Sequence, residues 1–207
     1  MELAQLRSKV AYQSAVLGGV ALLTAAALAV ADRLTAADIR AAQEQDVKQS
    51  LTQVMTLPYD NDMLQDTLKL PGKPNEVLVY RARQAGRVVA VVFQVQAPGY
   101  SGPVISMMGL DREGHILGVR IVKHTETPGL GDKVEPAKSP WVLSFTGKWL
   151  GQPPLSGWGV KKDGGVIDQF AGATITPRAV VKSVREGLQF FAQNRAQMLD
   201  EATGGKP

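Results

Sequence analysis

The strongest constraint on this chain is a run of 22 residues without a charge, between Lys9 and Asp32. As an α-helix the run would extend about 33 Å at 1.5 Å per residue, enough to cross the hydrocarbon core of a bilayer. A helix of this length in a soluble protein normally carries a polar stripe, which favours a membrane span here. We therefore expect a transmembrane helix over residues 10–31, preceded by a short segment at 1–9.

A cleaved signal peptide is the alternative interpretation of the same residues. Arg7 and Lys9 form a positive n-region, and both Ala27-Leu28-Ala29 and Ala29-Val30-Ala31 resemble cleavage sites. The apolar region of a signal peptide usually covers about 7 to 15 residues, so the length of this run favours an anchor. Positive charges lie on both sides of the run, so they do not decide its orientation.

The composition excludes several classes of function. The chain has no cysteine, which rules out disulfides, thiolate zinc sites, Cys-ligated iron–sulfur clusters and a thiol nucleophile. Any redox chemistry must then come from a bound organic cofactor. The net charge of +4 comes without a run of Lys and Arg, so no nucleic-acid binding is expected. The two histidines, His115 and His124, lie at opposite ends of one predicted strand, so no metal site is expected.

The residues after the uncharged run predict a compact α+β domain. Residues 36–56 are rich in helix formers and predict a juxtamembrane helix, inside a segment assigned to 32–75. β-branched runs separated by turn-forming residues then predict two hairpins, and hairpins flanked by helices indicate an antiparallel sheet. The predicted strands are 76–83, 87–97, 103–110 and 115–124.

An amphipathic helix is expected to close the domain. Apolar residues between Arg178 and Met198 recur at helical spacing, and Thr176 and Pro177 are typical of an N-cap and a first helical position. The domain is thus assigned to residues 76–199, followed by a flexible tail at 200–207.

Two loops are candidate sites. The first, HTETPGLGD at 124–132, combines glycines and a proline directly after a strand, and its plain alternative is an ordinary connection. The second, DQFAGATITP at 168–177, places Gly172 and Ala173 beside the hydroxyl of Thr174, just before the last helix. A phosphate esterified there would benefit from the positive end of the helix dipole, and the plain alternative is a threonine-rich cap. Phosphate-binding loops, dinucleotide fingerprints and serine elbows are all missing from the sequence.

The pattern D-x-x-[S/T]-G-A-T in the second loop resembles the flavinylation motif of the FMN-binding domain. This domain is shared by the G subunit of Rnf-type electron-transport complexes and the C subunit of Na+-translocating NADH:quinone reductases. The chain departs from the motif at Ala171, where the family usually has Ser or Thr. With the uncharged run included, the resemblance to the Rnf G subunit covers essentially the whole chain. It is carried by GYSGPV at 99–104, HTETPGLGD at 124–132, KKDGG at 161–165 and GATITPRAVVKSV at 172–184.

The resemblance implies a cofactor and a set of site residues. A periplasmic flavin transferase would use FAD to place FMN on Thr174 as a phosphoester, with Thr176 as the runner-up and Asp168 as part of the recognised motif. No catalytic residue is implied. The residues expected to contact the flavin are Gly172, Ala173, Thr176, Glu126, Thr127, Gly129, Leu130 and Gly131.

The resemblance also implies a function and a location. The chain would be an electron-carrier subunit, not a freestanding enzyme, in a complex that couples electron transfer between ferredoxin and NAD to ion translocation. It would cross the bacterial inner membrane once, with residues 1–9 in the cytoplasm and the domain in the periplasm. Its partners would be the other membrane subunits and the transferase. Two alternatives stay open: the C subunit of the quinone reductase, and a membrane-anchored binding module without flavin.

Overall fold

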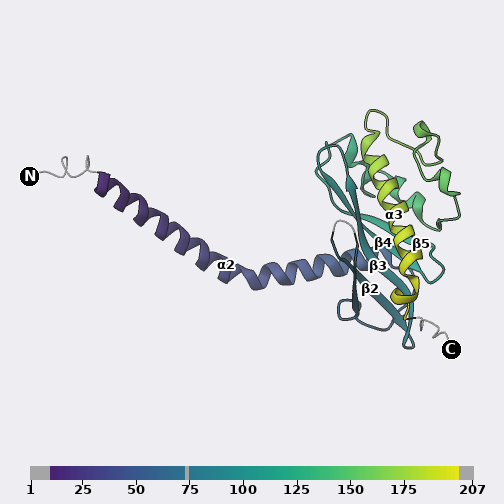
Figure 1. Ribbon diagram of the computed structural model, residues 1–207, viewed down its shortest axis with the longest axis horizontal. Coiled ribbons are helices and arrows are strands. Elements are labelled where there is room, and N and C mark those ends of the chain that lie inside the picture. Colours follow the sequence, from purple (N-terminus) through teal and green to yellow (C-terminus); the bar gives the residue numbers. More distant parts are fainter. Residues whose placement is uncertain (1–9, 73–74, 201–207) are drawn as a thin grey trace, which may run out of the picture. The chain divides into compact units, whose positions relative to one another are not determined.

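The computed structural model describes residues 10–72 and 75–200, and it divides into two compact units that meet between Val47 and Lys48. Figure 1 shows the long helix near the N-terminus and the sheet and last helix of the second unit. The predicted segment 1–9 and the tail beyond Asp200 lie outside the described residues.

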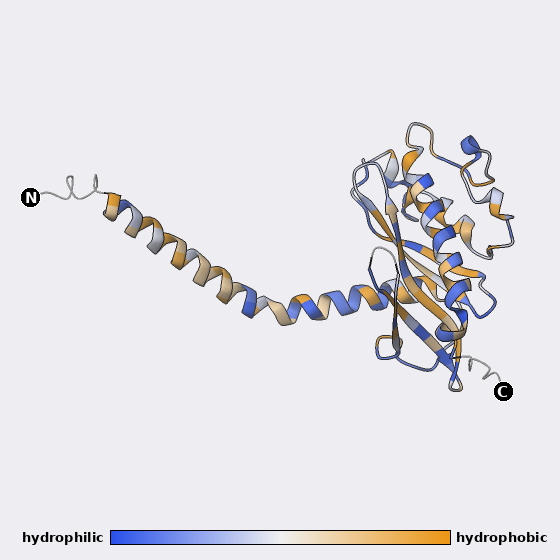
Figure 2. Cartoon of the chain, in the orientation of Figure 1, coloured by the Kyte–Doolittle hydropathy of each residue, from blue (hydrophilic) through white to orange (hydrophobic). Residues whose placement is uncertain are grey.

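Helix α2, Val10–Val54, supplies the first unit and continues into the second. Its most apolar 18-residue window has a mean hydropathy of 2.1 and contains no buried residue, so the helix is long and apolar enough to cross a membrane. Figure 2 shows the apolar residues concentrated in the first part of α2 and polar residues after them. The helices predicted at 10–31 and 36–56 are therefore one continuous helix that ends at Val54.

The second unit is built on a five-stranded antiparallel sheet in the order β1-β2-β3-β4-β5, in agreement with the predicted α+β class. The β2–β3 turn consists of Ala85 and Gly86, both with positive φ, the conformation that a two-residue hairpin loop demands. Four strands match the predicted ones within two residues, whereas β1 falls in the stretch assigned to 32–75 and was not predicted. The strands are β1 Thr67–Leu70, β2 Val77–Gln84, β3 Arg87–Pro98, β4 Pro103–Asp111 and β5 Ile116–Lys123.

Helix α3, Ile175–Met198, packs on one face of this sheet, and the end of α2 packs on the other. A Cβ atom on Gly187 of α3 would lie 2.5 Å from Met108 Cε. On the adjacent residue of β4, a Cβ atom on Gly109 would lie 2.7 Å from the carbonyl oxygen of Val54. Because neighbouring side chains of a strand point to opposite faces, the two helices lie on opposite sides.

Four short 3-10 segments connect β5 to α3, and the sequence analysis predicted none of them. They carry an aromatic cluster in which Trp141 contacts Phe145 and Phe170 edge to face, with ring centroids 5.3 and 5.1 Å apart. The cluster is buried and belongs to the same core as α3. The segments are η1 Gly131–Val134, η2 Pro140–Phe145, η3 Leu155–Gly157 and η4 Lys161–Asp163.

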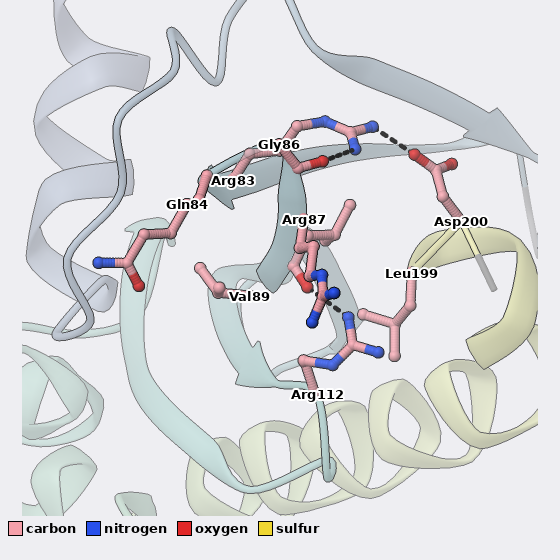
Figure 3. A pocket seen from close by; sticks show the side chains of 10 residues that line it. Arg83, Gln84, Gly86, Arg87, Val89, Arg112, Leu199 and Asp200 are labelled. Atoms are coloured by element: carbon pink, nitrogen blue, oxygen red, sulfur yellow. Dashed lines mark hydrogen bonds and ion pairs between the residues drawn. The ribbon is translucent and has the colours of Figure 1, made fainter.

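An ion-pair network ties β2 to the end of α3. Arg81 and Arg83 both bind the carboxylates of Asp66 and Asp200. Burial alone would raise the pKa of Asp66, but hydrogen bonds from Arg83 and Arg81 and their positive charges lower it below its usual value. Of this network, Arg83 and Asp200 line one side of an open pocket of about 680 Å³ (Figure 3). On the other side of this pocket, Arg112 Nη1 donates to the carbonyl of Val88 at 2.6 Å.

Candidate functional site

Thr174 is the N-cap of α3, and its side chain makes no capping hydrogen bond. Its carbonyl accepts from the N–H of Arg178 at 3.2 Å, so the helix starts at Ile175, earlier than predicted. Thr174 is half-buried at the positive end of the helix dipole. Pro177 has no N–H, so the first turn offers the backbone N–H groups of Ile175 and Thr176 to a bound anion.

The prediction that Thr176 is the N-cap is wrong. Thr176 lies inside the first helical turn, its side chain is 1% exposed, and its hydroxyl donates to Glu126 Oε2. The Thr-Pro pattern is typical of helix starts, but here a carboxylate 50 residues away in sequence takes the hydroxyl instead. Of the two threonines, only Thr174 is partly exposed.

Aromatic packing fixes the turn that leads into α3 on its buried side. Gly172 has φ of 76°, in the left-handed region that favours glycine, and the N–H of Ala173 donates to the carbonyl of Phe170 at 3.2 Å. Phe170 is 8% exposed and packs against Trp141, whose Nε1 donates to the carbonyl of Asp168 at 2.7 Å. The turn is therefore anchored in the core at Phe170 and exposed at Ala171 and Gly172.

Two ion pairs flank this turn at the surface. Lys161 Nζ lies 2.6 Å from Asp168 Oδ1, and both side chains are more than half exposed. Arg178 binds Asp163 with two of its donor nitrogens, at 2.6 and 2.5 Å, and these hydrogen bonds lower the pKa of Asp163. The KKDGG segment at 161–165 is thereby tied to the start of α3.

The loop at 124–132 lies against the same turn, so the two candidate loops of the sequence analysis form one site. A Cβ atom on Gly172 would lie 3.7 Å from Leu130 Cδ2, and one on Gly131 would lie 2.8 Å from Thr176 Oγ1. The carbonyl of Thr127 accepts from the N–H groups of Leu130 and Gly131 at 3.2 and 3.1 Å, which closes the loop into a turn. Leu130 is 43% exposed beside Gly172.

Glu126 points into the protein. Its side chain is 5% exposed, and Oε1 accepts from the backbone N–H groups of Tyr100 and Ser101, both at 3.0 Å. Its own N–H donates to His124 Nδ1 at 3.1 Å, which leaves the proton on Nε2 to be donated to Glu135 at 2.7 Å. Sequence reasoning singled out the segment GYSGPV at 99–104 but did not predict that its backbone binds this carboxylate.

The second histidine belongs to a different part of the domain. His115, Asp111 and Glu113 offer ligand atoms within 4.8 Å of one another at the β4–β5 turn. Asp111 already accepts from the backbone N–H groups of Glu113 and His115, at 3.0 and 2.7 Å, and lies 2.8 Å from the His115 ring nitrogen. These bonds stabilise the turn.

Comparisons with known proteins agree with the motifs. Residues 99–189 match the FMN-binding domain family. The chain is 45% identical to the G subunit of the ion-translocating oxidoreductase complex of Stutzerimonas stutzeri over 199 residues, covering 95% of this chain and 87% of that protein. It is 41% identical to the protein of the same name from Haemophilus influenzae, covering 90% and 92%. A solved structure of NqrC from Shewanella oneidensis is 23% identical with a TM-score of 0.46, over 67% and 74% of the two chains.

Proposed function

The chain belongs to the family of G subunits of ion-translocating oxidoreductase complexes, and on that premise we propose that it is a membrane-anchored flavoprotein that carries electrons through covalently bound FMN. The complex would couple electron transfer between ferredoxin and NAD to the movement of ions. The observation that carries the proposal is the hydroxyl of Thr174, which stands at the N-cap of α3 without making a capping hydrogen bond. When bound, FMN supplies the redox chemistry, and the residues of this chain set its position and surroundings.

Attachment at Thr174 would proceed by phosphoryl transfer from FAD on a flavin transferase. The Thr174 oxygen would attack the FMN-side phosphorus, a new phosphoester bond would form, and AMP would leave with the hydroxyl proton. Ala171 and Gly172 are exposed in the turn and present little side-chain bulk beside Thr174, which leaves room for this approach. Mass spectrometry of the peptide containing Thr174 tests the proposal directly. A chain without any fluorescent band on a denaturing gel would carry no covalent flavin, as expected of a binding module.

We also propose that the loop at 126–131 orients the flavin ring. A tether fixes only the phosphate end, while the position of the ring sets electron-transfer distance and potential. The exposed side chain of Leu130 lies beside Gly172, and Thr127 to Gly129 of the same loop are exposed, so both are available to the ring. The carboxylate of Glu126 is buried, so we assign it no ring contact.

Substituting Gly129 by valine tests the role of this loop. Gly129 has φ of 78°, which a β-branched residue cannot adopt without strain, so the loop should shift. We expect covalent FMN to remain while the flavin absorption spectrum and midpoint potential change. Gly147→Val is the matched control, because Gly147 has φ of 79° and the same open space in a different turn. If both variants keep the wild-type spectrum and potential, the loop does not contact the ring.

The domain is proposed to face the periplasm, where the family's transferase acts. The apolar window of α2, in which no residue is buried, supports an anchor, and its flanking charges leave the orientation to be measured. Alkaline phosphatase fused after Pro207 should be active, and green fluorescent protein fused there should stay dark after Sec export. The reverse pattern would contradict the orientation. An intact mass that includes residues 10–31 would separate the anchor from a cleaved signal peptide.

A further inference from the structure

One buried carboxylate connects three segments that surround the attachment site. Glu126 belongs to the loop at 124–132, and its Oε1 accepts two backbone N–H bonds from the β3–β4 turn, at Tyr100 and Ser101. Its Oε2 accepts the hydroxyl of Thr176, in the first turn of α3. Each oxygen therefore holds a different neighbour of the loop.

The backbone closes around this carboxylate so tightly that two glycines are required. A Cβ atom on Gly99 would lie 2.6 Å from Glu126 Oε1. A Cβ atom on Gly131 would lie 2.8 Å from both Glu126 Cβ and Thr176 Oγ1. Real Cβ atoms do not make such contacts with fixed neighbours, so the three segments must separate if either glycine gains a side chain.

A buried carboxylate is costly unless donors replace its water, and Glu126 has three such donors: two backbone N–H groups and one hydroxyl. It also lies at the positive end of α3, which favours a negative charge. The cluster is therefore stable only when all three segments are in place. A bond lost on one side leaves an unpaired polar atom in a buried site.

Thr176 is two residues from Thr174 in the same helical turn, so whatever fixes the Thr176 hydroxyl also fixes the position of the Thr174 hydroxyl. We propose that Glu126 is a positioning residue that locks the first turn of α3 to the two neighbouring loops and so presents Thr174 for flavin attachment. This inference rests on the proposed attachment at Thr174. It assigns Thr176 a structural hydroxyl and no flavin.

The test measures the initial rate of FMN attachment to the full-length chain by limiting flavin transferase, read as in-gel fluorescence per chain. Thr176→Val removes the hydroxyl without changing the shape of the side chain, and we expect the rate to fall about fivefold, the factor that corresponds to one lost hydrogen bond. Thr176→Ser keeps the hydroxyl and should restore the rate. Glu126→Gln keeps the size of the side chain but removes the negative charge that strengthens its three hydrogen bonds, and its NH2 group cannot accept the Thr176 hydroxyl proton, so we expect the rate to fall by a similar factor.

Ser183→Ala is the matched control. Ser183 is a buried hydroxyl in the same helix, 2% exposed, and it donates to the carbonyl of Val180 at 2.9 Å. The Ser183→Ala variant should lose as much stability as Thr176→Val but keep the wild-type rate of attachment. If Thr176→Val and Ser183→Ala are labelled equally fast, the positioning role is refuted. If the wild-type chain takes no FMN at Thr174, the proposed attachment itself is refuted, and this result differs from equal labelling of the two variants.

Discussion

Replacing Thr174 by alanine is expected to abolish the covalent flavin, so that the fluorescent band on a denaturing gel disappears completely. The phosphoester needs the Thr174 oxygen. The neighbouring Thr176 cannot replace it, because it is buried and its hydroxyl donates a hydrogen bond to Glu126. The loss should occur in a folded protein. Because the Thr174 side chain makes no capping bond, the substitution should cost less than about 1 kcal/mol of unfolding free energy.

An exposed threonine outside the site provides the control for that result. Thr146 ends segment η2 and is exposed, so Thr146→Ala should keep full fluorescence when expressed beside the transferase. Full fluorescence in Thr174→Ala would contradict the assignment. Mass spectrometry of the labelled peptide would then identify the residue that carries the flavin.

The sequence predicts those parts of the fold that local chemistry determines. Both hairpins are predictable because turn-forming residues separate β-branched runs, as at Ala85 and Gly86. Helix α3 is predictable because its apolar residues recur at helical spacing on the face that is buried. Strand β1 is missed, since Thr67–Leu70 is too short for periodicity to separate it from a loop.

The candidate site shows the same division between local and long-range information. The motif at 168–177 predicts Thr174 as the attachment residue, and the resemblance links it to the loop at 124–132, but neither indicates which way Glu126 points. That direction depends on the N–H groups of Tyr100 and Ser101, about 25 residues earlier in the chain. Thr176 is misassigned as a cap for the same reason, because its acceptor lies far away in sequence.

Two glycines in the sheet also have a role that the sequence did not reveal. Gly109 and Gly118 are paired across β4 and β5, and each faces the backbone of Val54 at the end of α2. A glycine inside a strand normally weakens it, so a pair in register indicates close approach of another backbone. Leu51 and Val54 are buried as a result, at 1% and 0% exposed. The end of α2 is thus part of the folded core of the second unit.

Substituting Gly109 by alanine should therefore destabilise the domain by about 3 kcal/mol, because overpacking adds to the lost burial of the α2 end. The new Cβ atom would lie 2.7 Å from the carbonyl oxygen of Val54, a backbone atom that no rotamer change can move. Thermal unfolding of the detergent-solubilised full chain should show a Tm lower by about 6 to 12 °C. Gly159→Ala is the control, since its Cβ atom would make an ordinary contact at 3.7 Å, and it should unfold near the wild-type temperature. Equal Tm values for the two variants would mean that α2 is not seated on the sheet. A lower value for Gly109→Ala alone would mean that a stable soluble fragment must begin at or before Lys48, not at residue 76.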